Sequence, residues 1–353
     1  MNIMIESREQ RAESREQRAE SREQRAEWID VVRGLGMLCV ILGHISSPLK
    51  PYIYSFHMPY FFILSGFLFK PGIKDYTTKL FKRLIIPYFI LCLINLIIQS
   101  IIQFQSLGIY SISNYLFGIV WSYGTTKYMP NCSPLWFLTC LFISLVLFNY
   151  IYSKLYGIKY FIVIWFLFFA GIYLGNLLNY FVLPLPWNVD IALVALSFIA
   201  LGREIRKKNI IQTICSSRLL GAFIAILIII WYQMVIINID PHIDFDARNY
   251  GNYLAMFVGS IALSFAVICI VVQMHFVNRN KVLIFLGQHT IFLMGFDYFS
   301  ESIAKVVFRI LHMHSWAMMF VIKCLVLFIG LFIWQQLCLQ IKHKGIRNLL
   351  LNV

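Results

Sequence analysis

Two neighbouring apolar segments carry ionisable side chains that a simple membrane-spanning stretch does not need. Residues 29–44 contain Asp30, Arg33 and His44, and residues 56–67 contain His57. Ionisable groups at membrane depth are costly and usually mark a functional site. A neutral imidazole can take a proton from a hydroxyl group near pH 7, and a guanidinium can hold phosphate through two parallel hydrogen bonds. The residue types therefore suggest acid–base chemistry beside an anion site.

Helical spacing places the first three of these side chains together. Arg33 and His44 are eleven residues apart, about three turns, so they share a face and lie roughly 16 Å apart along the axis. Asp30 lies one turn before Arg33. We expect an anion-holding cation at the membrane surface and an imidazole deeper in. A second interpretation stays open: Arg33 sets topology, His44 is a hydrogen-bonded core residue, and Asp30 orients either one or balances charge.

The composition of the chain indicates that these groups lie in membrane-spanning helices. Hydrophobic residues make up 60% of the chain, charged residues 13%, and the mean hydropathy is +0.74, which excludes an ordinary soluble protein. We predict an all-α, polytopic membrane helix bundle with about ten transmembrane helices over 28–341. A polar tail, 1–27, precedes it and a short basic tail, 342–353, follows. The predicted spans are 31–48, 52–69, 84–104, 134–152, 159–178, 187–202, 218–238, 251–274, 283–303 and 316–339, with an outer loop at 105–133.

The positive charges give an independent orientation. With the N-terminus inside, the segments on the inner side hold 24 Lys and Arg, and the outer loops hold five. Short cytoplasmic loops collect such residues, so both termini are predicted to be cytoplasmic. The net charge of +14 then reflects topology, and no nucleic-acid partner is expected. The eight Cys have no metal-like spacing, so neither a metal nor a disulfide framework is predicted.

Residues 7–27 are three identical copies of Ser-Arg-Glu-Gln-Arg-Ala-Glu. A coiled coil needs two apolar positions per heptad, and each copy offers only one Ala. Tandem copies of the seven-nucleotide unit AGCAGAG, however, translate into this peptide at every position. Because seven is not a multiple of three, gain or loss of one unit would shift the reading frame from Trp28 onward. We therefore hypothesise a slippage switch for expression of a bacterial surface function.

Several short motifs occur in a specific order along the first 140 residues. They are Ile29-Asp30-x-x-Arg33-Gly34 with His44, Phe56-His57-Met58-Pro59 with Phe62-x-x-Ser65-Gly66-Phe67, Lys82-Arg83-Leu84-Ile85-Ile86-Pro87-Tyr88-Phe89, and Pro134-Leu135-Trp136-Phe137-Leu138. In this combination the chain resembles the acyltransferase 3 family of multi-spanning membrane acyltransferases. The rest of the chain resembles it only through a similar run of spans.

The resemblance implies an O-acyltransferase of the bacterial inner membrane, with acetyl-CoA as acyl donor and a glycan or lipid-linked sugar as acceptor. His44, with Asp30, is then the catalytic candidate. Arg33 would hold the donor phosphates with Arg83 and Lys82, although these two also suit a membrane surface. His57, Ser65 and Trp136 are acceptor candidates. For Ser65 a close helix contact is the favoured interpretation, and for Trp136 a place in the interfacial belt is equally compatible with the pattern.

The second half adds acids at membrane depth. Asp297 and Glu301 are four residues apart, hence on one helix face, and Lys323 in the last span is their predicted partner. The family's Leu-Gly-x-Asn pattern becomes Leu286-Gly287-Gln288-His289, with His in place of Asn. An outer loop carrying His242, Asp244 and Asp246 looks like a metal site but is interpreted as solvated. Two other functions remain open: a transporter or polymerase of lipid-linked glycans, and a proton-coupled carrier that uses His44, Asp297 and Glu301.

Overall fold

The computed structural model describes most of the chain from residue 27 onward, and its described part is all-α. The described ranges are 27–102, 109–125, 127–129, 131–155, 157–181, 185–217, 219–237, 243–274, 277, 279–342, 347 and 350. Within them the only extended pairing is one isolated antiparallel bridge between Asp244 and Asn249. The all-α prediction is therefore confirmed. The repeat, apart from Glu27, and His242 lie outside the described residues.

Five of the described helices are long and apolar enough to cross a membrane, which agrees with a polytopic bundle. They comprise 76–101, 133–154, 157–178, 253–273 and 316–339. These ranges cover α4 (Tyr76–Leu80), a π-helical turn (Phe81–Ile85) and α5 (Ile86–Ile102); a 3₁₀ turn (Ser133–Leu135) and α7 (Trp136–Lys154); α8 (Gly157–Phe181); α12 (Tyr253–Gln273); and α17 (Trp316–Leu339). Of the other predicted spans, 187–202 falls mostly in the continuous helix 189–207 and 31–48 largely in helix 27–43, whereas 52–69, 218–238 and 283–303 are each divided into shorter segments.

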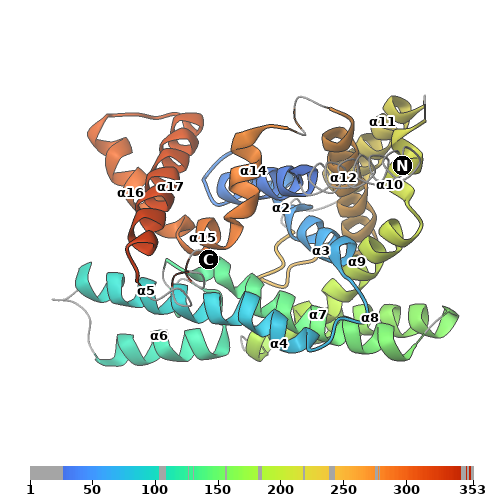
Figure 1. Ribbon diagram of the computed structural model, residues 1–353, viewed down its shortest axis with the longest axis horizontal. Coiled ribbons are helices and arrows are strands. Elements are labelled where there is room, and N and C mark those ends of the chain that lie inside the picture. Colours follow the sequence, from blue (N-terminus) through green and yellow to red (C-terminus); the bar gives the residue numbers. More distant parts are fainter. Residues whose placement is uncertain are drawn as a thin grey trace, which may run out of the picture.

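Two predicted continuous spans are broken, and one predicted loop is helical. Segment 52–69 divides into α2 (Lys50–Tyr54) and α3 (His57–Leu68), and segment 283–303 into α14 (Lys281–Gln288), α15 (Thr290–Gly295) and α16 (Asp297–Ile310). Segment 105–133 contains α6 (Ile109–Trp121), which packs along α5 (Figure 1). Non-helical backbone at membrane depth is tolerated where it lines a cavity or is buried in protein. The breaks before His57 and Asp297 meet this condition, because both residues are buried.

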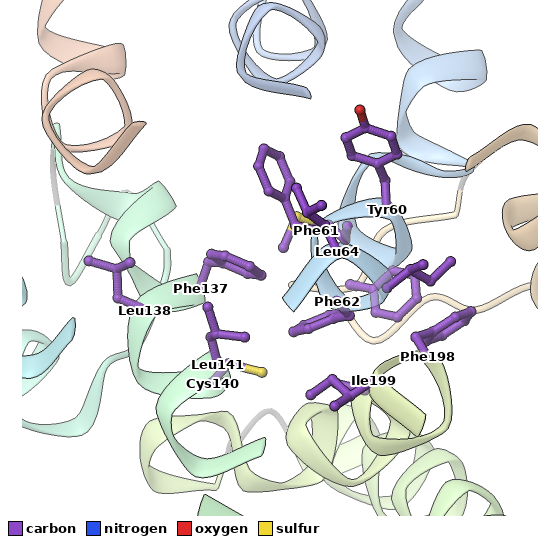
Figure 2. Close-up of a cluster of buried hydrophobic side chains, with 14 of the residues drawn as sticks. Tyr60, Phe61, Phe62, Leu64, Phe137, Leu138, Cys140, Leu141, Phe198 and Ile199 are labelled. Atoms are coloured by element: carbon purple, nitrogen blue, oxygen red, sulfur yellow. The ribbon is translucent and has the colours of Figure 1, made fainter. Parts of the chain in front are cut away.

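The core of the molecule is built around α3. Figure 2 shows Phe62 of α3 facing Phe137 of α7, with Phe198 and Ile199 of α9 (Val189–Lys207) on another side of α3, while the Tyr60 ring points away from α7. The phenyl rings of Phe62 and Phe137 lie 5.2 Å apart. Helix α8 covers the outer side of α9. Thus α3 is enclosed by neighbouring helices.

Glycines let the central helices approach closely. A methyl group added at Gly66 of α3 would collide with the backbone of Ile199, and one added at Gly202 of α9 would collide with the backbone of Ile63. The same reciprocal arrangement joins helix 27–43 to α14. There, Gly34 meets the backbone of Leu283 and Gly287 meets the backbone of Asp30. Small residues at such contacts are the usual basis of close helix packing in membranes.

The remaining helices flank this core. Helices α10 (Ile210–Cys215) and α11 (Leu220–Trp231), followed by a π-helical segment (Tyr232–Ile237), pack with α12 at the right of Figure 1. Helices α16 and α17 lie side by side at the left. Helix 27–43 crosses between the two groups, and the Tyr60 hydroxyl of α3 donates a hydrogen bond to its Val32 carbonyl at 2.7 Å.

Candidate active site

A cavity of about 330 Å³ lies where helix 27–43 ends. It brings together parts of the chain that are far apart in sequence, and two of its lining side chains are the predicted His44 and His57. Trp136, the third predicted residue in this cavity, comes from the start of α7. The other polar or aromatic lining residues include Tyr54, Thr125, Ser133, Asp244, Asp246 and Tyr298. The arrangement is an aromatic pocket with imidazole and carboxylate groups in its walls.

His44 is held at the cavity by a buried aspartate from the second half of the chain. Its Nδ1 lies 2.6 Å from Oδ2 of Asp297, whose side chain is fully buried. A carboxylate can only accept a hydrogen bond, so Nδ1 carries the proton and Nε2 is the nitrogen left for the cavity. The imidazole retains 11% exposure. His44 is therefore oriented as a base that can reach a ligand, with an anion behind it.

Lys323 holds Asp297 in turn. Its ammonium nitrogen lies 3.0 Å from Oδ1 in ion contact and donates a hydrogen bond of 3.1 Å to Oδ2. The same ammonium lies 3.4 Å from Oε2 of Glu301, and Lys305 on the surface pairs with Oε1 of that residue at 2.7 Å. The predicted Asp297–Glu301–Lys323 ion cluster is thus confirmed. Lys323 and Lys305 balance the charges of the two acids, and Oδ2 of Asp297 still contacts the imidazole of His44.

The break between α15 and α16 positions Asp297. Phe296 has a non-helical φ of −108°, and Asp297 is the first residue of α16. A carboxylate at a helix N-terminus is stabilised by the dipole and by the free backbone N–H groups there. A continuous helix over 283–303 would lack this terminus. Asp297 is therefore both the first residue after the helix break and the buried partner of His44.

His57 shows a related arrangement without a carboxylate. Its Nδ1 lies 2.9 Å from the carbonyl oxygen of Ile53, to which it donates, and the residue is 5% exposed. Its Nε2 therefore also faces its surroundings as an acceptor. The Tyr54 ring lies 5.0 Å from the His57 ring and 6.4 Å from that of His44, so it is a neighbour of both. Pro59 sits in the first turn of α3, where proline is tolerated without a bend.

The predicted donor residues lie elsewhere. Nη1 of Arg33 pairs with Oδ1 of Asp30 at 3.2 Å, and the other carboxylate oxygen accepts from Gln288 of α14 at 3.2 Å. Neither Asp30 nor Arg33 lines the cavity. Asp30 therefore contacts Arg33, and the partner of His44 is Asp297. Arg83, on the π-helical turn with Lys82, is close enough to Arg33 for their charges to repel.

Ser65 stands apart from both groups. It precedes Gly66 in the tight contact between α3 and α9, and it does not line the cavity. This agrees with the close-helix-contact interpretation of the Ser65-Gly66 pair.

His289, which replaces the Asn of the family pattern, has a hydrogen-bond partner at both ring nitrogens. Its Nδ1 donates to the Phe285 carbonyl at 2.8 Å, and its Nε2 lies 2.8 Å from the amide nitrogen of Gln335.

Sequence reasoning missed a second buried ion pair beside the cavity. Asp190, at the start of α9, is fully buried and accepts two hydrogen bonds from Arg248, at 2.8 Å from Nε and 3.2 Å from Nη2. Arg248 also donates to the side chain of Asn188 and to the Asp246 carbonyl. The pair fastens loop 243–251 over the cavity. A lone acid near the start of an apolar span was the available signal, since it requires a partner.

The loop that we interpreted as solvated instead forms a wall of the cavity. Asp244 and Asp246 both line it. Burial, together with the nearby charge of Asp244, raises the pKa of Asp246 well above its usual range. In the described part of the chain no group of three His, Cys, Asp or Glu side chains could hold a metal ion. The acids of the loop are therefore considered as ligand-facing groups.

Comparison with known proteins gives one match. The family model described as "Acyltransferase domain" matches residues 26–340, most of the chain. Neither the curated proteins nor the solved structures include a match to this chain.

Proposed function

Because the chain belongs to the acyltransferase 3 family, whose domain covers residues 26–340, we propose that it transfers an acetyl group from cytoplasmic acetyl-CoA to a hydroxyl of an envelope glycan. The family membership establishes an acyltransferase, and the long apolar helices establish a multi-pass membrane protein. The acetyl donor, the glycan acceptor and the bacterial inner membrane are the proposal. The observation that carries it is the 2.6 Å contact between His44 and Asp297 at the cavity wall.

His44 acts as the general base in this mechanism. Its Nε2 takes the proton from the acceptor hydroxyl as the hydroxyl oxygen attacks the thioester carbonyl carbon. The carbon–sulfur bond then breaks, and the proton passes from Nε2 to the leaving thiolate, which gives an ester and free CoA. Asp297 stabilises the transient imidazolium and fixes the tautomer, as carboxylates do behind catalytic histidines. Lys323 holds the Asp297 carboxylate in place and is a positioning residue.

Arg33, Arg83 and Lys82 are proposed to hold the phosphates of the donor. The pairing of Arg33 with Asp30 orients its guanidinium but leaves donors for a phosphate. The distance of about three turns to His44, roughly 16 Å, suits a ligand whose anionic end and reactive thioester are joined by a long chain. Acetyl-CoA has this form, with the pantetheine arm between its diphosphate and its sulfur.

The acceptor is proposed to enter the cavity from the opposite end. His57 and Trp136 line it, and an indole ring offers an apolar platform for a sugar face. The basic residues favour an orientation with Arg33 and both termini in the cytoplasm and the cavity toward the outer face of the inner membrane. In this arrangement acyl transfer crosses the bundle rather than the lipid.

Incubation of the purified protein with labelled acetyl-CoA and a glycan acceptor tests the function. We expect labelled ester and free thiol from the native chain, and loss of both in His44→Ala. His314→Ala is the matched control, because His314 is exposed beyond α16. A transporter, polymerase or proton-coupled carrier would release no thiol, and full activity of His44→Ala would exclude the proposed base.

The repeat at residues 7–27 supports a regulatory proposal about expression. We propose that its coding tract changes length by slippage and so switches the protein on and off, as a surface-modifying enzyme can require. Sequencing the gene in single colonies is the test. Exact seven-base repeats that vary in number among colonies support the switch, whereas mixed synonymous codons or a constant length exclude it.

A further inference from the structure

The described walls of the cavity carry two acids and two histidines but no Lys or Arg. Asp244 and Asp246 face it, and none of the described residues lining it is Lys or Arg. The neighbouring Arg248 is committed elsewhere: its Nε and Nη2 are bonded to Asp190, and its Nη1 donates to the Asp246 backbone carbonyl at 2.6 Å. The loop therefore presents carboxylates to the cavity while its own guanidinium is turned to a structural partner.

The Asp246 carboxylate lies in a narrow space beside an aromatic ring. A methyl group added at Gly124 would stand 2.7 Å from Oδ1 of Asp246 and 2.8 Å from Cδ1 of Trp136. Within the described part of the chain this carboxylate accepts no hydrogen bond. Asp244 uses Oδ1 for the backbone N–H groups of Asp246 and Ala247, which leaves Oδ2. Two carboxylates thus retain acceptor capacity next to the indole.

The two histidines of the cavity also present hydrogen-bond acceptors to a ligand. His57 is at least nine-tenths buried, and its Nδ1 proton is given to the Ile53 carbonyl, so its Nε2 can only accept. His44 is likewise an acceptor at Nε2, because Asp297 takes its Nδ1 proton. Two imidazole nitrogens and two carboxylates therefore offer hydrogen-bond acceptors to whatever fills the cavity. A ligand that supplies no donors would leave these acceptors unpaired, which weakens binding.

A polyhydroxylated ligand meets this demand, whereas an anionic one does not. Sugar hydroxyl groups donate hydrogen bonds along their edges, and a sugar C–H face can lie on an indole. A carboxylated, sulfated or phosphorylated sugar would bring its charge against Asp244 and Asp246, with no Lys or Arg among the described lining residues to balance it. Like charges placed together in a binding site are a strong means of rejection.

We propose that Asp244 and Asp246, with Trp136, form the acceptor subsite and restrict acyl transfer to sugar residues that carry no negative charge. This inference rests on the acyl transfer proposed above and adds a substrate class to it. The two aspartates act as specificity determinants, and the chemistry stays with His44. The selection arises from a set of acceptor atoms that only a donor-rich, uncharged or cationic sugar can satisfy.

Three methyl glycosides of similar shape test the selectivity: a glucoside, a glucuronoside and a glucosaminide. We expect the native protein to acetylate the glucoside at least about ten-fold faster than the glucuronoside, and the glucosaminide to remain a substrate. Asp246→Asn and Asp244→Asn should each narrow the glucoside-to-glucuronoside ratio several-fold. Asp75→Asn is the matched control, since it removes the same charge from an exposed position at the start of α4. Equal rates for the two sugars, or an unchanged ratio in Asp246→Asn, would overturn the proposal.

A second measurement needs no acceptor turnover. Ala247 is exposed and lines the cavity, so Ala247→Cys can report the local potential through a cationic and an anionic thiosulfonate reagent. We expect the cationic reagent to react several-fold faster, relative to a free thiol, and Asp246→Asn to reduce this preference. Equal rates would overturn the negative subsite even if none of the three glycosides is acetylated.

The two proposals fail in different ways. Thiol release from acetyl-CoA in the presence of an uncharged hydroxyl acceptor reports the proposed function alone, because it requires the donor, the base and an acceptor hydroxyl but no discrimination between charged and uncharged sugars. A native protein that releases no thiol contradicts the acyl transfer. A protein that releases thiol normally, but in which Asp246→Asn changes neither the sugar ratio nor the reagent preference, contradicts only the acceptor subsite.

Discussion

Asp297 and Asp190 are both fully buried aspartates that face a cation at the same cavity, but their surroundings differ. Asp190 meets a planar guanidinium that occupies both of its oxygens. Asp297 meets a single ammonium, and its Oδ2 still accepts a hydrogen bond from His44. Arg saturates a carboxylate through a fixed fork of donors, whereas Lys acts as a point charge. Pairing with Arg248 therefore gives Asp190 a structural role, whereas pairing with Lys323 leaves Asp297 able to bind His44.

The same Asp→Asn change at the two positions should have opposite consequences. In Asp297→Asn we expect kcat for acyl transfer to fall by about 10²- to 10⁴-fold, the usual contribution of a positioned base. Glu301 still neutralises Lys323, so the melting temperature should change little. Single-turnover acetyl transfer and thermal unfolding in detergent measure the two effects. Near-native kcat in a folded Asp297→Asn protein would show that His44 does not depend on this carboxylate.

Asp190→Asn should act on stability. The change leaves the buried guanidinium of Arg248 without its counter-ion, and breaking a buried pair in this way costs about 3–5 kcal/mol. We expect a lower yield of folded protein and a lower melting temperature. The protein that does fold should still release thiol from acetyl-CoA. Loss of thiol release with unchanged stability would reverse the assignment of the two sites.

Gly287→Ala tests whether close packing keeps the reactive pair aligned. The added methyl group would collide with the backbone of Asp30, so helix 27–43, which ends at His44, must move away from α14. Overpacking of this kind costs about 1–3 kcal/mol. Gly330→Ala is the control, because nothing lies within 4 Å of the new methyl group and a helical Ala is preferred to Gly. Equal unfolding temperatures for both variants would show that the contact can relax.

The smallest effect of a substitution is expected at Asp246, a third aspartate, whose side chain makes no ion pair in the described part of the chain. Burial raises its pKa in the folded protein, so the folded state holds this proton more tightly than the unfolded state does. Stability is then lost as pH rises from the unfolded value, about 3.9, toward the folded pKa. Asp246→Asn should raise the melting temperature near neutral pH and leave it unchanged in acid. A difference that does not depend on pH would exclude titration as its origin.

The sequence was most informative where one segment contained the whole pattern. Asp297 and Glu301 are one helical turn apart, and two acids at membrane depth required the cation found at Lys323. His44 and Arg33 share a helix, so their spacing followed from helical geometry alone. His57 and Trp136, selected from motifs, also reached the cavity together with His44. The family resemblance, which rests on these motifs, agrees with the match over residues 26–340.

Contacts between segments that are distant in sequence could not be predicted from local spacing. Asp297 is 253 residues from His44, and apolar spans carry little information about which of them touch. Asp30 was nearer in sequence and was therefore assigned to the site, although its partners are Arg33 and Gln288. Hydropathy also failed to show the breaks at His289 and Phe296, because the flanking residues remain apolar. Tertiary packing, rather than local propensity, decides where such helices end.

The glycine contact between α3 and α9 has a consequence for membrane insertion. Helix α3 has 12 residues, roughly 18 Å at 1.5 Å per residue, which is too short for a hydrocarbon layer of about 30 Å. It carries His57 and is seated against Gly202, which is synthesised much later. The translating ribosome must therefore deliver α9 before α3 has its final neighbours. Nascent chains released before Gly202 should leave residues 57–68 open to water-borne labelling reagents, and longer ones should protect them.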